Sequence, residues 1–98
     1  MTDSTEWILA NPNDGQAHFL RGNAHLEKRD LELAVADFAR AILLDSGFAE
    51  ARNSRSIARF LQGELNLATA DLEAAVRIDP SHSGAAASLE HVRRLRGR

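Results

Sequence analysis

The sequence contains no cysteine and no tyrosine, and it has one tryptophan, one lysine and two prolines among 98 residues. Without cysteine, the chain cannot form disulfides, thiolate zinc sites or a cysteine nucleophile. No apolar run approaches the roughly 20 residues that a membrane-spanning helix needs. The first ten residues, MTDSTEWILA, carry acidic residues and no basic residue, unlike a secretory signal. We therefore expect a soluble, cytoplasmic protein, and the preference for arginine over lysine favours a bacterial source.

The length suits one domain spanning residues 1–98. Charge is distributed unevenly along it: residues 1–50 hold nine acids and four bases, whereas residues 51–98 hold five acids and eight bases. The basic half ends in HVRRLRGR. A basic tail this short is more often solubilising than functional, so nucleic-acid binding through it is the least favoured alternative.

An internal repeat dominates the sequence. Residues 15–48 align with residues 49–82 without a gap, so the second unit begins directly where the first one ends. The identical pairs are Ala17/Ala51, Arg21/Arg55, Ala24/Ala58, Leu31/Leu65, Leu33/Leu67, Ala34/Ala68, Ala36/Ala70, Asp37/Asp71, Ala41/Ala75 and Asp45/Asp79. A fixed period of this kind indicates supersecondary units that stack on one another.

Each unit is predicted to contain two helices. Breaks containing proline or glycine recur once per unit, at 11–15, 45–47 and 79–81, and shorter turns fall at 28–30 and 62–64. These breaks predict helices at about 15–28, 31–45, 49–62, 65–78 and 82–96, and segment 3–10 resembles the end of a further helix. No stretch alternates with a period of two, so no strand is expected.

The 34-residue period resembles the tetratricopeptide repeat, whose pattern runs small residue, alanine, aromatic, alanine, proline. The matching residues are Gly22, Ala34, Phe38, Ala41 and Ser46 in the first unit, and Ser56, Ala68, Leu72, Ala75 and Pro80 in the second. The resemblance covers residues 15–82 fully and extends partially into both ends. It implies an all-α fold in which antiparallel helix-turn-helix repeats stack as a short right-handed α-solenoid. Repeat 1 is then 15–48, repeat 2 is 49–82, 3–10 is a leading helical cap and 82–96 is a C-terminal capping helix.

Small and apolar residues are expected to hold this stack together. Ala17 and Ala24 fall on one line of their helix, as do Ala51 and Ala58, and such small side chains allow close helix approach. The leading segment, through Trp7 and Ile8, is expected to cover one end of the stack.

Large apolar positions of each first helix depart from the family pattern. They hold His18, Arg21 and His25 in the first unit, and Arg52, Arg55 and Arg59 in the second. Because an unpaired buried charge is costly, the arginines that face the second helix need acidic partners. We expect Arg21 to pair with Asp37, and Arg55 and Arg59 with Asp71.

Candidate sites for chemistry are sparse. His18 and His25 share one helical face, but a metal site would need further ligands, and Asp37 is the only nearby candidate. We favour packing and hydrogen bonding for these histidines. No nucleophile motif, phosphate loop or paired-carboxylate arrangement stands out. We expect no catalytic residue, cofactor or metal, and therefore no enzyme.

The tetratricopeptide resemblance implies that the first helices line a concave groove for a peptide. The residues placed there are Gln16, Phe19, Asn23, Leu26, Glu50, Asn53, Ile57 and Phe60. Phe19 and Ile57 lie opposite the alanine line, so we expect them to contribute little to packing. Leu26 has the alternative role of filling space between helices.

One tetratricopeptide subclass grips the C-terminal carboxylates of heat-shock chaperones through lysine, asparagine and arginine. Only Asn23 agrees with that clamp. Phe19, Ser54, Gly84 and Ser88 replace its other members. We expect a module that binds a different protein or peptide partner, with self-association as a structural alternative.

Overall fold

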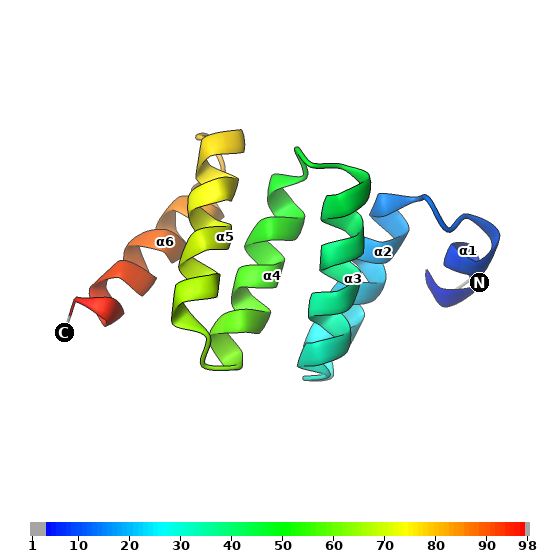
Figure 1. Cartoon of the computed structure of the whole chain (residues 1–98), viewed down its shortest axis with the longest axis horizontal. Coiled ribbons are helices and arrows are strands. Elements are labelled where there is room, and N and C mark those ends of the chain that lie inside the picture. The colour runs from blue at the N-terminus through cyan, green and yellow to red at the C-terminus, as the bar shows by residue number, and fades with distance from the viewer. Residues whose placement is uncertain (1–3, 98) are drawn as a thin grey trace.

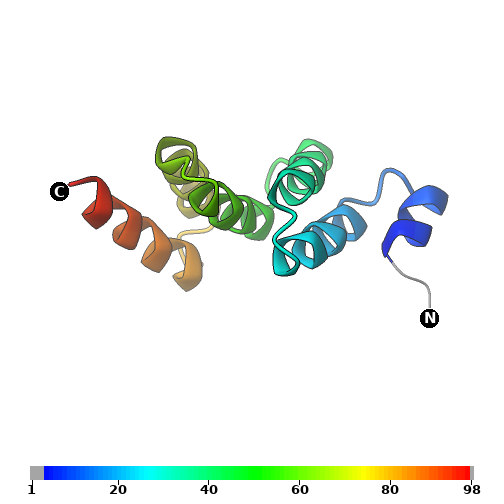
Figure 2. The same cartoon turned by 90° about the horizontal axis from the view of Figure 1, so that it is seen from below.

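The computed structural model describes residues 4–97. In that range all regular structure is helical, and the helices lie side by side along a body of 46 × 26 × 20 Å with the two ends of the chain at opposite ends (Figures 1 and 2). The helices are α1 (Ser4–Ala10), α2 (Gly15–Glu27), α3 (Leu31–Leu44), α4 (Ala49–Leu61), α5 (Leu65–Ile78) and α6 (Ser83–Arg96). None of them is long and apolar enough to span a bilayer.

The observed helices confirm the predicted fold class. From α2 to α6, each boundary lies within one residue of its predicted position. The predicted start of the leading helix at residue 3 lies outside the described residues. Helices α2 and α3 form one antiparallel pair and α4 and α5 form the next, so α2, α4 and α6 share one face of the stack. Figure 1 is seen from the opposite face, with α3 and α5 in front.

Equivalent turns join the two helices of each repeat. Arg29 follows α2 with φ 65°, and Gly63 follows α4 with φ 82°. In the first turn the amide of Asp30 donates to the carbonyl of His25 at 2.9 Å, and in the second that of Glu64 donates to Arg59 at 2.8 Å. These are the bonds of a Schellman cap, which requires a left-handed residue just past the helix.

In the core, the small residue of each first helix packs against the large apolar residue of the second helix. Phe38 of α3 is fully buried, and a β-carbon added to Gly22 would come within 2.6 Å of its ring. Repeat 2 has Ser56 and Leu72 at the same two positions, both buried. A larger residue on the first helix is thus matched by a smaller one on the second, as close packing demands.

Ion pairs join the first and second helices as predicted. Arg21 donates to both carboxylate oxygens of Asp37 at 2.8 and 2.7 Å, an arrangement that raises the pKa of Arg21. Arg55 donates to both oxygens of Asp71 at 2.9 and 2.6 Å, and Arg59 adds a third bond at 3.0 Å. Both aspartates are buried, so the prediction of packed arginine partners is confirmed.

The N-terminal end of the stack differs from expectation in two respects. Ile8 is buried, but Trp7 is 47% exposed, so the prediction that Trp7 covers the end is wrong. Its indole Nε1 instead donates to Asp14 Oδ2 at 2.5 Å. Ala24 is exposed, whereas Ala17, Ala51 and Ala58 are buried. Over its described residues, Ser4–Ala10, α1 leaves Ala24 in the second half of α2 uncovered.

Candidate functional site

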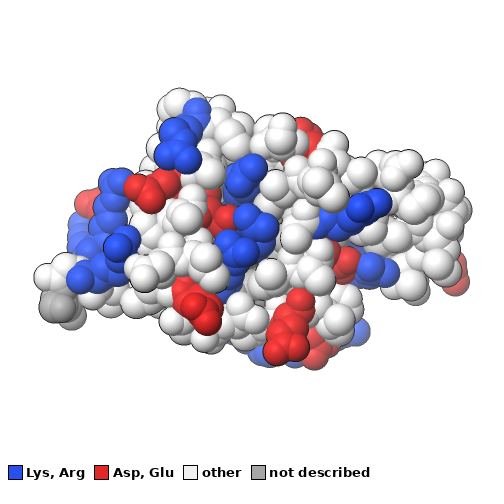
Figure 3. Space-filling model, viewed as in Figure 1, with Lys and Arg blue, Asp and Glu red and all other residues white. Residues whose placement is uncertain are grey.

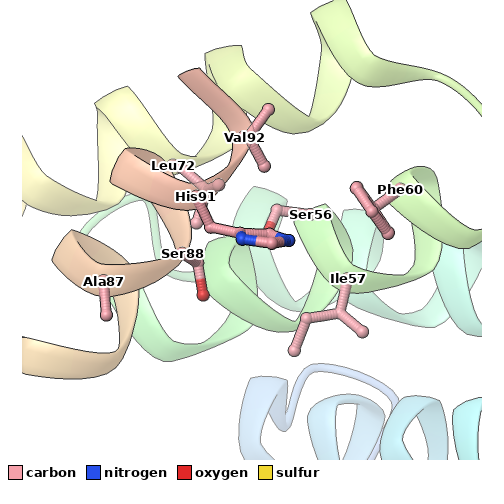
Figure 4. A pocket seen from close by; sticks show the side chains of 8 residues that line it. All are labelled: Ser56, Ile57, Phe60, Leu72, Ala87, Ser88, His91 and Val92. Carbon is pink, nitrogen blue, oxygen red and sulfur yellow. The ribbon is translucent and has the colours of Figure 1, made fainter. Parts of the chain in front are cut away.

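A hollow of about 330 Å³ lies between α4 and α6 on the face that these helices share with α2 (Figure 4). Its lining comes mainly from these two helices, with one residue of α5 at the base. The lining residues are Ser56, Ile57, Phe60, Leu72, Ala87, Ser88, His91 and Val92. The volume is at the lower end of the range for binding pockets and suits one or two side chains rather than a large ligand.

The hollow is apolar, and part of it is fixed by the core. Leu72, Val92 and Ser56 are buried, whereas Ile57 is 40% exposed. The imidazole of His91 extends from α6 toward α4, with its centroid 6.3 Å from that of Phe60 (Figure 4). The lining contains no arginine, lysine, aspartate or glutamate. The site can therefore gain free energy by burying an apolar group, while Ser88 and His91 offer polar atoms at its edge.

Contacts beside the hollow fix the position of α6 against α4. His82 Nδ1 accepts from the amide of Ala85 at 3.0 Å and so caps α6. Its Nε2 lies 2.9 Å from Glu50 Oε2 of α4. Because the cap occupies the lone pair of Nδ1, the neutral ring carries its proton on Nε2 and donates it to Glu50. Near this junction Asn53 Oδ1 is buried without a hydrogen-bond partner among residues 4–97.

The eight predicted groove residues separate into two groups. Ile57 and Phe60 line the hollow, and Asn53 and Glu50 lie one and two turns nearer the start of α4. The residues from α2 do not line it. Gln16 is exposed and Asn23 half-buried, whereas Phe19 is buried and Leu26 packs against the first core cluster.

Phe19 corrects one expectation directly. It is 7% exposed, and its ring centroid lies 4.9 Å from Phe48 and 6.0 Å from Phe38. The expectation that Phe19 contributes little to packing is therefore wrong. Phe48, in the connection between α3 and α4, packs against the Phe19 ring, while the neighbouring Leu20 is 50% exposed.

The prediction missed the contribution of α6. Ala87, Ser88 and His91 lie two repeat lengths after Phe19, Leu20 and Asn23. Extending the repeat register into a third unit therefore identifies these α6 residues as groove positions. The sequence held this signal, because identical pairs continue at the same offset beyond residue 82: Ala51/Ala85, Ser54/Ser88, Arg59/Arg93, Leu61/Leu95 and Gly63/Gly97.

The two histidines of α2 surround Asp37. His18 Nε2 lies 2.9 Å from the carbonyl of Pro12, and its Nδ1 lies 3.8 Å from Asp37 Oδ1. His25 Nε2 lies 3.6 Å from Asp37 Oδ2. Both imidazole rings therefore lie beside the ion pair between Arg21 of α2 and Asp37 of α3. Among residues 4–97 no group of three or more side chains has the arrangement of a metal site.

Comparisons with known proteins agree on the architecture. The sequence profile of the tetratricopeptide repeat family matches residues 6–47 and 19–83. No curated protein sequence shows significant similarity to the chain.

Solved structures superimpose closely. The second tetratricopeptide domain of human RPAP3, in complex with the HSP70 peptide SGPTIEEVD, has a TM-score of 0.86 and 30% identity over 92% of this chain and 75% of its own. The first such domain of Spaghetti (RPAP3), bound to the HSP90 peptide SRMEEVD, has a TM-score of 0.92 and 22% identity over 97% and 75%. The Arabidopsis OM64 domain has a TM-score of 0.89 and 26% identity over 93% and 75%. The matched profile, the internal repeat and these superpositions establish that the chain belongs to the tetratricopeptide repeat family.

Proposed function

We propose that the chain is a protein-interaction module and that the hollow between α4 and α6 binds an apolar side chain of a peptide or protein partner. The observation that carries the proposal is an apolar depression with Ile57 still 40% exposed. Tetratricopeptide domains that superimpose on this chain have been solved with bound peptides, which supports the same general role.

The chemistry of the hollow favours an apolar anchor over an acidic chain end. The peptides in the two RPAP3 complexes both end in Glu-Glu-Val-Asp. Such a segment needs cations to neutralise its carboxylates, but no lysine or arginine lines the hollow. The clamp positions hold Phe19 and Ser54, which are buried, and Gly84 and Ser88 on α6. A peptide with a leucine, isoleucine or aromatic residue complements these surroundings better.

The proposed role is binding without a chemical step. The hydroxyl of Ser56 donates to the carbonyl of Asn53 at 2.5 Å, so it is engaged with backbone instead of being free for attack. The other groups in the hollow are mostly hydrocarbon, which suits capture of a side chain by burial.

A peptide library displayed on phage, selected against the folded protein, would test the proposal. Selected peptides should share an apolar residue, and Ile57→Ala should weaken their binding by roughly thirtyfold, the effect of truncating a central anchor by about 2 kcal/mol. Leu43→Ala is the matched control, because Leu43 is 72% exposed on α3, away from the hollow. Equal losses from the two variants, or selected peptides without an apolar residue, would contradict the proposal.

Self-association is the second candidate, and exposed apolar residues at the N-terminal end favour it. Leu9 is 80% exposed beside the half-exposed Trp7. Sedimentation velocity should then show a dimer that Leu9→Ser dissociates, whereas a concentration-independent monomer would exclude this role.

A further inference from the structure

Three arginines form a stripe along α4 on the side opposite the hollow. Arg52, Arg55 and Arg59 are spaced i, i+3 and i+7, so they lie on one side of the helix, and Ile57 points the other way. We call these three residues the arginine stripe. Figure 3 shows basic side chains gathered over α4, between the α3 and α5 helices. The stripe is therefore separate from the surface assigned to the proposed function.

Positive charge on the stripe exceeds the negative charge that it meets. Asp71 is the one carboxylate that pairs with it among residues 4–97, through Arg55 and Arg59. Three guanidinium groups with one carboxylate leave two positive charges. The same positions of α2 hold His18, Arg21 and His25, and there Asp37 meets a single arginine. The excess thus belongs to repeat 2 and is not a consequence of the fold.

Arg52 is the member of the stripe without a partner. Its Nε is buried and makes no hydrogen bond to any of residues 4–97. A guanidinium has five N–H donors, and one whose donors all lack acceptors gains free energy when an anion pairs with its accessible Nη atoms. The Arg52 Nη atoms make no hydrogen bond within residues 4–97 and are not among the buried unpaired atoms, so an external acceptor can reach them. The Arg55 and Arg59 side chains are 15% and 19% exposed and already bond Asp71.

The surroundings of the stripe favour a polypeptide ligand. Arg52 lies one turn before Arg55, so a carboxylate that pairs with Arg52 also lies near the positive charge that Arg55 and Arg59 share over the single carboxylate of Asp71. The flanking helices expose Leu33 and Leu43 on α3 and Leu67 on α5. Nucleic-acid sites instead present many exposed cations to successive phosphates. We propose that the arginine stripe binds neighbouring carboxylates in an acidic segment of another polypeptide.

A titration with hexaglutamate tests the proposal, with hexaglutamine as the uncharged control. At ionic strength below about 0.1 M, where screening is weak, hexaglutamate should bind and hexaglutamine should not. Arg52→Gln should weaken binding about tenfold to a hundredfold, as expected for loss of one charged hydrogen bond. Arg96→Gln removes an equal charge from the exposed end of α6 and should change the affinity less than twofold.

Nuclear magnetic resonance of the unaltered protein provides a second readout that does not depend on the fold of a variant. The Arg52 Nε–H signal should shift on adding hexaglutamate, with smaller changes at Arg96. Absence of binding, an unshifted Arg52 signal, or equal effects of Arg52→Gln and Arg96→Gln would overturn the proposal. Tighter binding of an oligothymidylate with the same dependence on Arg52 would replace the acidic polypeptide with nucleic acid as the ligand.

Discussion

Removing the Asp71 carboxylate should cost more stability than removing any surface charge of this chain. Asp71 is 3% exposed and accepts three hydrogen bonds from two guanidinium groups. Asp71→Ala leaves both Arg55 and Arg59 without their acceptor, between helices that cannot move apart freely. Breaking one side of a buried ion pair costs about 3–5 kcal/mol. Because the arginines are 15% and 19% exposed and can partly reach water, we expect the lower end of that range.

The matched control lies two residues along the same helix. The Glu73 side chain is 43% exposed, and its carboxylate lies 3.6 Å from Arg93, a loose surface pair. Glu73→Ala should therefore cost about 0–1 kcal/mol. Since a domain of this length has a total stability of about 5–15 kcal/mol, the two variants should differ visibly.

Urea unfolding followed by circular dichroism at the helix band measures both variants. The midpoint should fall strongly for Asp71→Ala and little for Glu73→Ala, with unchanged slopes that keep the two-state comparison valid. Equal shifts of the midpoint would mean that Arg55 and Arg59 hydrogen-bond to water as favourably as to Asp71. In that case, the ion pairs between first and second helices could not be what fixes their packing.

Three further changes test other parts of the structure by the same unfolding assay or by fluorescence. Gly22→Ala should destabilise by about 1–3 kcal/mol through overpacking against Phe38, and adding Phe38→Leu should restore part of the loss; no recovery would refute the size matching. Arg29→Gly should stabilise by about 1 kcal/mol because Arg29 has φ 65°, and an unchanged midpoint would argue against strain there. The bond from Trp7 and the amide of Ala17 lower the pKa of Asp14 below 3.8, so its stabilising effect is present above pH 3.8 and is lost as pH falls through the lowered pKa. Trp7 fluorescence should report that acid transition, and Asp14→Asn should abolish it.

The sequence predicted the helices and the ion pairs because both depend on local spacing. Glycine and proline breaks recur once in every repeat, and these positions limit where each helix can begin and end. Arg55 and Asp71 repeat the offset of Arg21 and Asp37, so one argument about buried charge applied to both repeats.

The groove was predicted less completely because burial depends on which element covers a residue. Phe19 and Ile57 both lie on the outer side of a first helix, but Phe48 covers Phe19 whereas Ile57 remains open. The helical periodicity of the sequence does not show where the connection between α3 and α4 runs, and therefore does not show that Phe48 covers Phe19. Likewise, the large apolar side chain of Trp7 suggested a core position. In the structure α1 buries Ile8 and leaves the indole of Trp7 partly exposed.

Helix α4 connects the two proposed surfaces, and its sequence shows how one helix can serve both. Its alanines, Ala51 and Ala58, are fully buried and keep the backbone close to its neighbours. Because small side chains provide the packing, other positions of α4 can carry Ile57 on the side of the hollow and Arg52 on the opposite side. A helix that packed through large apolar residues at the positions of Arg52, Arg55 and Arg59, as the family pattern has, would leave no charge there. The departure from that pattern is therefore what gives repeat 2 a second surface.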